Sequence, residues 1–382
     1  MKRKDIPVYL GLAALLAGLA AFPSESVSAA KDGLRMCTDL IVPSLFPFFV
    51  LSSMMIELGL AEVLGKLASP VMKRLFNVGG SCAVPFLLGF IGGYPVGARA
   101  AITLYDRGGC RRREAERLLC FCNNTGPAFI LGVVGAGVFG DTRTGLILYG
   151  VHFLSSVTVG LVFRGKTRGD IGEVQTADKL TEHDTLPAVF VSCVKSSFTA
   201  VLGICGFVIF FTVLIRLLYL AGIIPAAAEA LSFILRPLGV TSAGAEGIIS
   251  GLIELTSGVS SLRGAAGSMS KNAAMAAFML GWAGLSVHFQ VLGFISESGL
   301  RARNYIFGKL LHGVISALYA YAAFSVFSPG EEVALVLADG VTALSGAGAG
   351  HTLLISACAL VPFAVLSACA AGKIYIERRR LK

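Results

Sequence analysis

The chain alternates between long apolar stretches and short polar segments. A helix needs about 20 apolar residues to cross a bilayer, and eight stretches approach or exceed that length. The pattern therefore predicts an all-α polytopic membrane protein with spans at 6–22, 36–60, 114–140, 143–163, 188–221, 272–297, 303–327 and 351–376. The stretch 188–221 is too long for one straight span, so its ends are expected to extend beyond the hydrocarbon.

Two further apolar segments, 81–104 and 243–267, are interrupted by glycine and polar residues. Every backbone N–H and C=O must be paired inside the hydrocarbon, so an interrupted helix there has to face protein or a polar cavity. We therefore expect both segments to form re-entrant hairpins. Segments 61–76 and 225–238 are expected to be short amphipathic helices on the surface.

The order of these elements repeats along the chain. Span, surface helix, hairpin, broken span and span follow one another from residue 36, and the same order returns from residue 188. Three crossings in each unit would invert the second unit relative to the first, and inverted repeats with discontinuous helices are a transporter architecture. The expected units are an N-terminal span (1–33), a first repeat (34–164), a polar cytoplasmic linker (165–187), a second repeat (188–327), and an acidic outside loop with a C-terminal span (328–382).

Composition and charge support a membrane protein and place its ends. Of 382 residues, 55% are hydrophobic and 14% are charged, with a mean hydropathy of +0.77, whereas soluble proteins carry about 25% charged residues. The net charge of +9 does not indicate nucleic-acid binding, because the basic residues form short clusters and not one face. The excess of positive charge at 107–117 and similar segments predicts eight spans with both termini in the cytoplasm, and Lys309 is counted among the cytoplasmic residues.

The amino terminus allows two readings. The basic start "MKRK", an apolar run and "PSESVSAA" together resemble a cleaved signal peptide. An uncleaved first span is the alternative that we favour.

Motifs of enzymes and metal sites are missing from the sequence. The nine cysteines are scattered, most of them inside apolar runs, without a C-x-x-C pair, which is typical of small buried side chains. No H-E-x-x-H, G-x-S-x-G or Walker motif occurs. We therefore expect no catalytic residues, no metal and no cofactor, and a movement of solute that is passive or ion-coupled.

The break in the first hairpin is the first candidate site. The stretch "GFIGGYPVGARA" (89–100) prevents regular helix pairing, and a hairpin tip that exposes N–H groups at a helix start can bind an anion. The alternative is that the glycines only allow a tight helix crossing. The candidate binding residues here are Gly92, Gly93, Tyr94, Pro95, Gly97 and Arg99.

The broken span of the first repeat adds polar side chains at membrane depth. In "FCNNTGPAF", Asn123, Asn124 and Thr125 precede Pro127, which removes a helical N–H. Polar residues in mid-membrane are costly without partners. They either contact a substrate or ion, as we expect, or they merely satisfy the freed carbonyls.

The second repeat carries matching candidates. "GLIELTSG" places Glu254, Thr256 and Ser257 at the hairpin break, and a glutamate at this depth could carry a proton, coordinate a cation or pair with Arg99 or Arg216. "LSVHFQ" supplies Ser286, His288 and Gln290, and His288 can titrate near neutral pH. An extended backbone at this second break would put His288 and Gln290 on one side. Arg216 is expected to snorkel to the interface or to pair locally.

Five segments in matching order resemble one family. They are "LIVPSLFPFFVLS" (40–52), "GGYPVGA" (92–98), "FCNNTGPAF" (121–129), "GLIELTSG" (251–258) and "GLSVHFQ" (284–290). In these segments the chain is similar to the YlbJ (SpoVV) sporulation integral membrane protein family, of the wider nucleoside-recognition or Gate domain group. The resemblance runs over about residues 34–327.

The resemblance implies a protein of the bacterial cell membrane, in the outer forespore membrane of a sporulating cell. Members of the family are thought to help dipicolinic acid leave the mother cell toward the forespore. For that small aromatic dianion, Arg99, the helix ends and the Asn123–Thr125 segment could meet the carboxylates, and Tyr94 or Trp282 could stack on the ring. Our own hypothesis is that Glu254 and His288 accept a coupling proton.

Other functions stay open. The substrate could be a nucleoside or another small metabolite, as the wider domain name suggests. A non-transporting scaffold that recruits sporulation partners is less consistent with polar residues that gather at midplane breaks, and an intramembrane hydrolase lacks a nucleophile–base pair. Membrane lipid, a homo-oligomer or a sporulation membrane protein are the expected partners besides the substrate.

Overall fold

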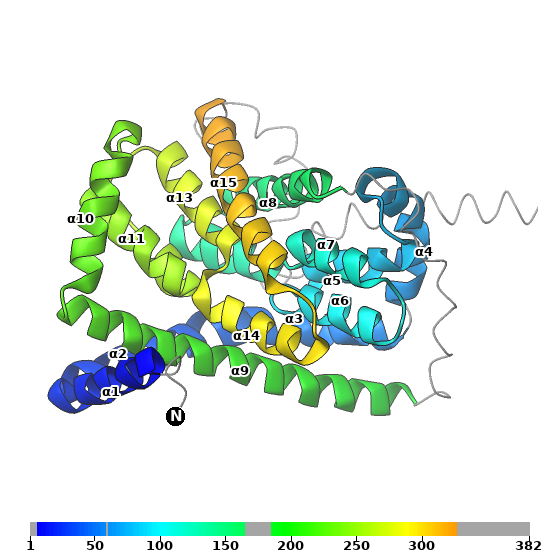
Figure 1. Ribbon diagram of the computed structural model, residues 1–382, viewed down its shortest axis with the longest axis horizontal. Helices are drawn as coiled ribbons and strands as arrows, with labels where there is room; N and C mark the ends of the chain where they lie inside the picture. The colour runs from blue at the N-terminus through cyan, green and yellow to red at the C-terminus, as the bar shows by residue number, and fades with distance from the viewer. Residues whose placement is uncertain (1–5, 59, 165–184, 327–382) are drawn as a thin grey trace, which may run out of the picture.

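The computed structural model describes residues 6–58, 60–164 and 185–326, and these residues form helices without a β-strand (Figure 1). The first half of the chain contains α1 (Ile6–Ala21), α2 (Pro23–Met36), α3 (Val42–Glu57), α4 (Leu60–Val71), α5 (Ala83–Gly92), α6 (Val96–Asp106), α7 (Arg112–Cys122) and α8 (Thr142–Val162). The second half contains α9 (Leu186–Leu220), α10 (Ile223–Leu235), α11 (Ser242–Ile253), α12 (Leu255–Ser260), α13 (Met269–Trp282), α14 (Gly284–Ser298) and α15 (Ala302–Val326). Three wider, π-helical segments cover Cys37–Ile41, Met72–Phe76 and Ala128–Val138.

The two halves present their elements in the same order. Helix α3 is followed by α4, the α5–α6 hairpin, a span broken between α7 and Ala128–Val138, and α8. Helix α9 is likewise followed by α10, the α11–α12 hairpin, a span broken between α13 and α14, and α15. The predicted all-α membrane fold, its two hairpins and its two broken helices are therefore confirmed.

The number of spans depends on how bent helices are counted. Four stretches of the described residues are long and apolar enough to cross a membrane: 142–162, 186–220, 269–298 and 302–326. Three bent pairs raise the number to seven if each pair is one span, with bends of 100° (6–21 and 23–41), 105° (66–76 and 80–92) and 116° (223–238 and 242–253). The expected eighth span at 351–376, the outside loop before it and the linker at 165–184 lie outside the described residues.

The segment after the first apolar run is helical. Residues of "PSESVSAA", which resemble the end of a signal peptide, begin α2, and α2 packs along the long helix α9. Pro23 occupies the first turn of α2, where a missing N–H costs nothing. Figure 1 shows α1, α2 and α9 together along one edge of the molecule.

A second group of helices, α5, α7, α8, α13 and α15, packs together, and glycines allow the close approach of these helices. Gly308 of α15 lies against the backbone of Cys120 on α7, where a Cβ atom would come within 2.9 Å of Cys120 Cα. Gly281 of α13 faces Gly313 of α15 in the same way. Small residues at helix crossings are the usual means of packing in membranes, where the hydrophobic effect does not drive helices together.

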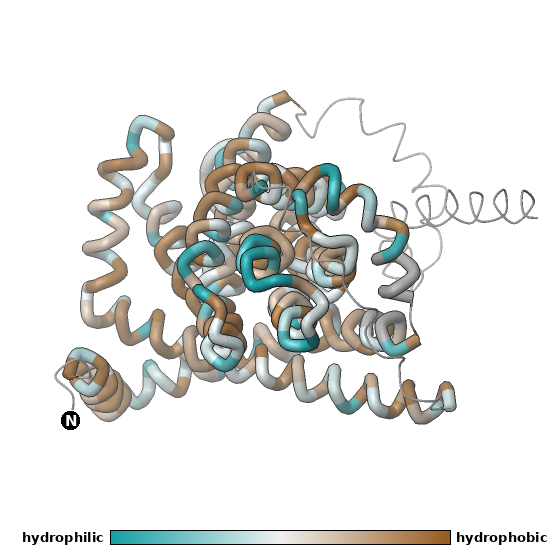
Figure 2. The backbone as a smooth tube through the Cα atoms, turned by 45° about the vertical axis from the view of Figure 1, so that its right-hand side comes forward, coloured by the Kyte–Doolittle hydropathy of each residue, from teal (hydrophilic) through white to brown (hydrophobic). Residues whose placement is uncertain are grey.

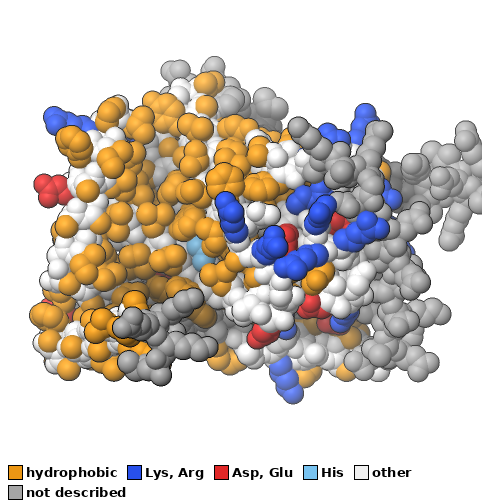
Figure 3. All heavy atoms as spheres, viewed as in Figure 1, with side chains coloured by type: hydrophobic (Ala, Val, Ile, Leu, Met, Phe, Trp, Pro, Cys, Tyr) orange, Lys and Arg blue, Asp and Glu red, His pale blue; other side chains and the backbone are white. Residues whose placement is uncertain are grey.

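The outer surface is suited to lipid. Figure 2 shows that the outer helices are hydrophobic along most of their length, and side chains such as Phe233, Ile234 and Leu238 are largely exposed. In Figure 3 a broad hydrophobic area stands beside a group of lysine and arginine side chains. Apolar area next to a basic cluster is the pattern expected of an integral membrane protein with cytoplasmic loops.

Candidate functional site

The two breaks of the first half contact each other. Helix α5 ends at Gly92 and α6 begins at Val96, with a left-handed φ of 70° at Gly93 between them. A Cβ atom on Gly93 would lie 2.9 Å from the backbone nitrogen of Gly126, in the break between α7 and Ala128–Val138. Only glycine provides both this φ and this approach, so the sequence pattern of the hairpin is a packing requirement as well as a break.

The two breaks of the second half contact each other in the same manner. Glu254 is the single extended residue between α11 and α12. Ala283, with a φ of 83°, separates α13 from α14, and Gly284, with a φ of 80°, begins α14. A Cβ atom on Gly284 would lie 3.0 Å from the nitrogen of Leu255.

One cavity lies where the four breaks converge. Its empty space amounts to about 640 Å³ when the open solvent at its mouth is included. The second-half breaks contribute Glu254 and Thr256, and α14 contributes Ser286 and Gln290. The remaining walls come from the first-half breaks and from apolar side chains on the chain before α3, on α3, on the 128–138 segment and on α9: Gly92, Gly93, Tyr94, Thr125, Gly126, Ile41, Leu45, Phe48, Phe49, Phe129, Ile204, Phe207 and Val208.

Eight of the candidate residues from the sequence line this cavity: Gly92, Gly93, Tyr94, Thr125, Glu254, Thr256, Ser286 and Gln290. They come from both halves of the chain and from all four breaks or the helix turns beside them. The structure therefore brings together residues that are up to 198 positions apart (92 to 290) in the sequence.

The other seven candidates do not line the cavity. Pro95 is half-buried outside the lining, and Gly97 packs within the hairpin, where a Cβ atom on it would come 2.7 Å from Gly89 Cα. Arg99 is exposed on α6, and its guanidinium lies 6.0 Å from the ring centre of Phe294 on α14. Asn123, Asn124, Ser257 and His288 are turned toward protein.

The asparagine side chains bridge helices. Asn124 donates from Nδ2 to the carbonyl oxygen of Phe121 at 2.9 Å, and Asn123 donates to the Tyr305 hydroxyl at 3.4 Å. The Asn124 contact fits the alternative that the amides satisfy carbonyls freed by the break, whereas Asn123 contacts a hydroxyl on α15. Thr125 behaves differently, because it lines the cavity while its hydroxyl donates to the carbonyl of Leu280 on α13 at 3.2 Å.

Glu254 caps a helix. Its two carboxylate oxygens accept hydrogen bonds from the backbone N–H groups of Thr256 at 2.9 Å and Ser257 at 2.6 Å. The side chain is buried and forms part of the cavity wall. Arg216, one of the residues considered as its partner, instead forms an ion pair with Glu25 of α2, which agrees with the expectation of local pairing.

The expected side-by-side placement of His288 and Gln290 is wrong. Both residues belong to the regular helix α14, because the backbone break is confined to Ala283 and Gly284. Successive residues of a helix are separated by about 100°, so positions two apart point in different directions. Gln290 lines the cavity, whereas His288 is buried behind it, with Nδ1 3.0 Å from the Tyr305 hydroxyl and its ring 4.3 Å from that of Trp282.

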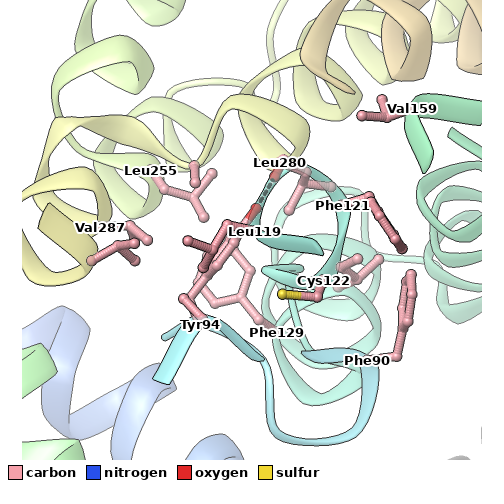
Figure 4. Close-up of a cluster of buried hydrophobic side chains, with 14 of the residues drawn as sticks. Phe90, Tyr94, Leu119, Phe121, Cys122, Phe129, Val159, Leu255, Leu280 and Val287 are labelled. Atoms are coloured by element: carbon pink, nitrogen blue, oxygen red, sulfur yellow. Dashed lines mark hydrogen bonds between the residues drawn. The ribbon is translucent and has the colours of Figure 1, made fainter. Parts of the chain in front are cut away.

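Trp282 does not line the cavity. Its indole Nε1 donates to the carbonyl oxygen of Leu252 at 3.0 Å, which ties α13 to the hairpin arm α11. Tyr94, the other aromatic residue considered for stacking, does line the cavity, and its hydroxyl donates to Leu280 O at 2.8 Å (Figure 4).

Sequence reasoning missed a buried cation. Lys309, assigned to the cytoplasmic surface from the charge count, has no exposed area in the structure. Its Nζ lies between the first-half breaks and α15, 2.9 Å from the Tyr94 hydroxyl and 2.8 Å from the carbonyl oxygen of Asn123. Lys309 is buried because α15 begins at Ala302, which places Lys309 two turns inside the helix and not at its end. The available signal was the pair Lys309 and His312, which share one face of an apolar helix.

Comparisons with known proteins agree with this architecture. A family model described as "Nucleoside recognition", the Gate domain, matches residues 40–151 and 201–301. The sporulation integral membrane protein YlbJ of Bacillus subtilis (strain 168) is 30% identical over 323 residues, which cover 80% of this chain and 79% of that protein.

Solved structures of the transporter CNTnw share the fold. One intermediate state matches with a TM-score of 0.54 and 14% identity, covering 86% of each chain. An inward-facing, substrate-bound state matches with a TM-score of 0.54 and 12% identity, over 83% of this chain and 84% of that one. The fold is that of concentrative nucleoside transporters. With the Gate domain in both halves and YlbJ similar over four fifths of its length, this integral membrane chain belongs to the YlbJ family of sporulation membrane proteins.

Proposed function

We propose that the protein carries a small solute across the membrane through the cavity between the four helix breaks. The observation that supports this most directly is the convergence of discontinuous helices from both halves on one mostly apolar cavity that carries a few polar side chains. Transporters with repeated halves bind their substrates at such a place, because unwound backbone supplies polar groups at membrane depth. A scaffold would need no cavity of this kind.

Dipicolinate is the substrate that we propose first. The resemblance to the sporulation family suggests it, and the cavity lining includes the aromatic side chains of Tyr94 and Phe129, on which a ring could pack. The Lys309 ammonium lies directly behind Tyr94 and would contribute positive potential at this part of the lining. The proposed route runs from the mother cell across the outer forespore membrane.

A nucleoside is the second candidate, and the cavity lining favours it in one respect. Glu254 is the charged residue among the described lining residues, and no lysine or arginine lines the cavity with it. A carboxylate repels a dianion, whereas a neutral solute could use the hydrogen-bonding groups of Thr125, Ser286 and Gln290. The Gate family description and the CNTnw fold are compatible with this reading.

Uptake into proteoliposomes tests the proposal. Purified wild-type protein should take up labelled dipicolinate above empty liposomes, with uridine measured in parallel to rank the two candidates. The Gln290→Leu variant should lose most uptake, because it replaces a cavity-lining amide with an apolar group. Glu297→Leu, an exposed position on the same helix, serves as the control and should retain uptake. Uptake of neither solute would contradict both substrate proposals, and equal behaviour of the two variants would contradict the assigned site.

A further inference from the structure

Lys309 is held by three neutral acceptors that come from three parts of the fold. Its Nζ lies 2.9 Å from the Tyr94 hydroxyl at the hairpin break, 2.8 Å from Asn123 O at the span break, and 3.3 Å from Nδ1 of His312 on α15. An ammonium has three N–H donors, so each one has an acceptor. The arrangement matches a charged lysine.

The described residues provide no carboxylate partner for this charge. Two ion pairs among the described residues, Arg112–Glu116 and Arg216–Glu25, do not include Lys309. Burying a charge without a counter-ion costs free energy, which good hydrogen bonds offset only while all of them are present. Withdrawal of one acceptor would therefore favour release of the proton.

Two of the acceptors belong to the segments that form the cavity. Tyr94 lines it directly, and Asn123 precedes Thr125, which lines it too. A helix break that shifts when the cavity opens or closes would change the distance to Nζ. The charge state of Lys309 is thus linked physically to the conformation of the first-half breaks.

Histidines continue the polar cluster away from the cavity. His312 Nε2 lies 3.2 Å from the carbonyl of His152 on α8, and the two rings are 4.4 Å apart. His152 Nε2 accepts from the backbone N–H of Thr125 at 3.0 Å, while its Nδ1 is buried without a partner in the described part of the chain. The titratable groups near Lys309 on the surrounding elements are Tyr94 of the hairpin break, Cys122 of α7, His152 of α8, His288 of α14, and Tyr305 and His312 of α15.

We propose that Lys309 is the proton-binding residue that couples solute movement to a proton, with Tyr94 between it and the cavity. The proposal rests on the transport function proposed above and moves the coupling site from Glu254 and His288 to Lys309. In the net step, the ammonium gives one proton to water and becomes an amine. Later in the transport cycle the amine takes one proton from water on the other side of the membrane. Tyr94 separates Nζ from the cavity, since its hydroxyl contacts Nζ and the residue lines the cavity. A shift of the Tyr94 side chain would therefore open Nζ to water in the cavity.

The test measures accumulation of the transported solute, dipicolinate or uridine, in proteoliposomes under an imposed pH gradient. One proton per solute and a gradient of one pH unit, with the membrane potential clamped, support about tenfold accumulation. We expect this accumulation in the wild type. A pH-sensitive dye trapped inside the liposomes should report a change of the internal pH at the same time. A sodium gradient alone should give none.

Two variants test whether Lys309 is the residue that binds the coupling proton. Lys309→Gln cannot bind the proton and Lys309→Arg cannot release it, so both should lose the accumulation of about tenfold while tracer exchange at equal pH continues. Lys195→Gln, at an exposed position of α9, is the matched control and should behave as the wild type. Exchange has no net proton movement, so its survival distinguishes loss of coupling from misfolding.

The outcomes separate the two proposals. Absence of both uptake and exchange in the wild type would contradict the proposed function. Wild-type uptake that ignores the pH gradient, or follows sodium, would overturn the coupling proposal alone. Accumulation retained in Lys309→Gln, or loss of exchange and accumulation together in both variants, would also overturn it, the latter by showing that Lys309 is structural.

Discussion

The two halves have the same order of helices but stabilise their breaks by different chemistry. In the first half, the break is tied to the opposite half: Lys309 of α15 contacts Tyr94 and Asn123, and Tyr94 donates to Leu280 of α13. In the second half, Glu254 caps the helix that follows it, through Thr256 and Ser257. A repeated fold thus determines where breaks occur, while individual side chains decide whether a break is held locally or by a distant helix.

The hairpins repeat this difference in their glycine pairs. Gly89 faces Gly97 in the first hairpin, and Gly251 faces Gly258 in the second. The first pair is also enclosed by the backbone carbonyl of Cys122, which cannot move independently of its helix. The second pair adjoins the side chain of Met279, which is flexible and can shift. Gly97 should therefore tolerate an added methyl group less well than Gly251.

The largest difference in unfolding free energy is expected between two variants that add a methyl group, one in each hairpin. Gly97→Ala places a Cβ atom against Gly89 Cα and the backbone of Cys122, and such overpacking is expected to cost about 3 kcal/mol of unfolding free energy. Gly251→Ala should cost about 1 kcal/mol, because the Met279 side chain can move away. The midpoint of thermal unfolding in detergent measures both. Equal losses in the two variants would show that the Met279 side chain yields no more readily than the backbone of Cys122.

Removing the Tyr94 hydroxyl should have the next largest effect. Tyr94→Phe leaves Lys309 without one of its three acceptors and removes one donor to Leu280 O. An expected loss of about 2 kcal/mol follows from an unsatisfied buried ammonium hydrogen. Tyr319→Phe is the control, because that hydroxyl is paired with Thr158 at an exposed position. A Tyr94→Phe protein as stable as its control would mean that Lys309 finds another acceptor.

Neutralising Glu254, which caps α12, should lower the free energy of unfolding by a smaller amount. Glu254→Gln keeps one acceptor oxygen and places an amide NH₂ against the other backbone N–H, so one capping bond is lost. We expect a loss of about 1 kcal/mol, measured by the same thermal midpoint against Glu246→Gln on α11. A loss larger than that of Tyr94→Phe would reverse the ranking of the two halves.

The smallest effect is expected outside both breaks. Arg216 and Glu25 join α9 to α2, and their side chains are 43% and 40% exposed. A pair this accessible contributes about 0.5 kcal/mol. A double-mutant cycle with Arg216→Gln and Glu25→Gln measures the coupling directly. A coupling energy above that of the Glu254 cap would show that α2 is held on α9 mainly by charge.

The sequence was sufficient for the class of fold and for the places where helices break. Apolar stretches of span length, glycine and proline within two of them, and a repeated order of elements predicted the membrane fold, the hairpins and the broken spans. These features are local, because helix formation, glycine conformation and transfer into lipid depend mainly on neighbouring residues. Most candidates at the exact breaks, such as Gly93, Thr125 and Glu254, were placed in the cavity for the same reason.

Only the tertiary structure decided which polar residues face the cavity and which face one another. His288 and Gln290 are two positions apart, yet the regular helix α14 turns them in different directions. Arg99 and Lys309 are both basic, yet Arg99 is exposed on α6 while Lys309 is enclosed by residues more than 180 positions earlier in the chain. The orientation of a side chain depends on helix phase, and its burial depends on the helices that pack against it. Counting charges along the sequence predicts neither the orientation nor the burial of a side chain, because both depend on contacts between distant segments.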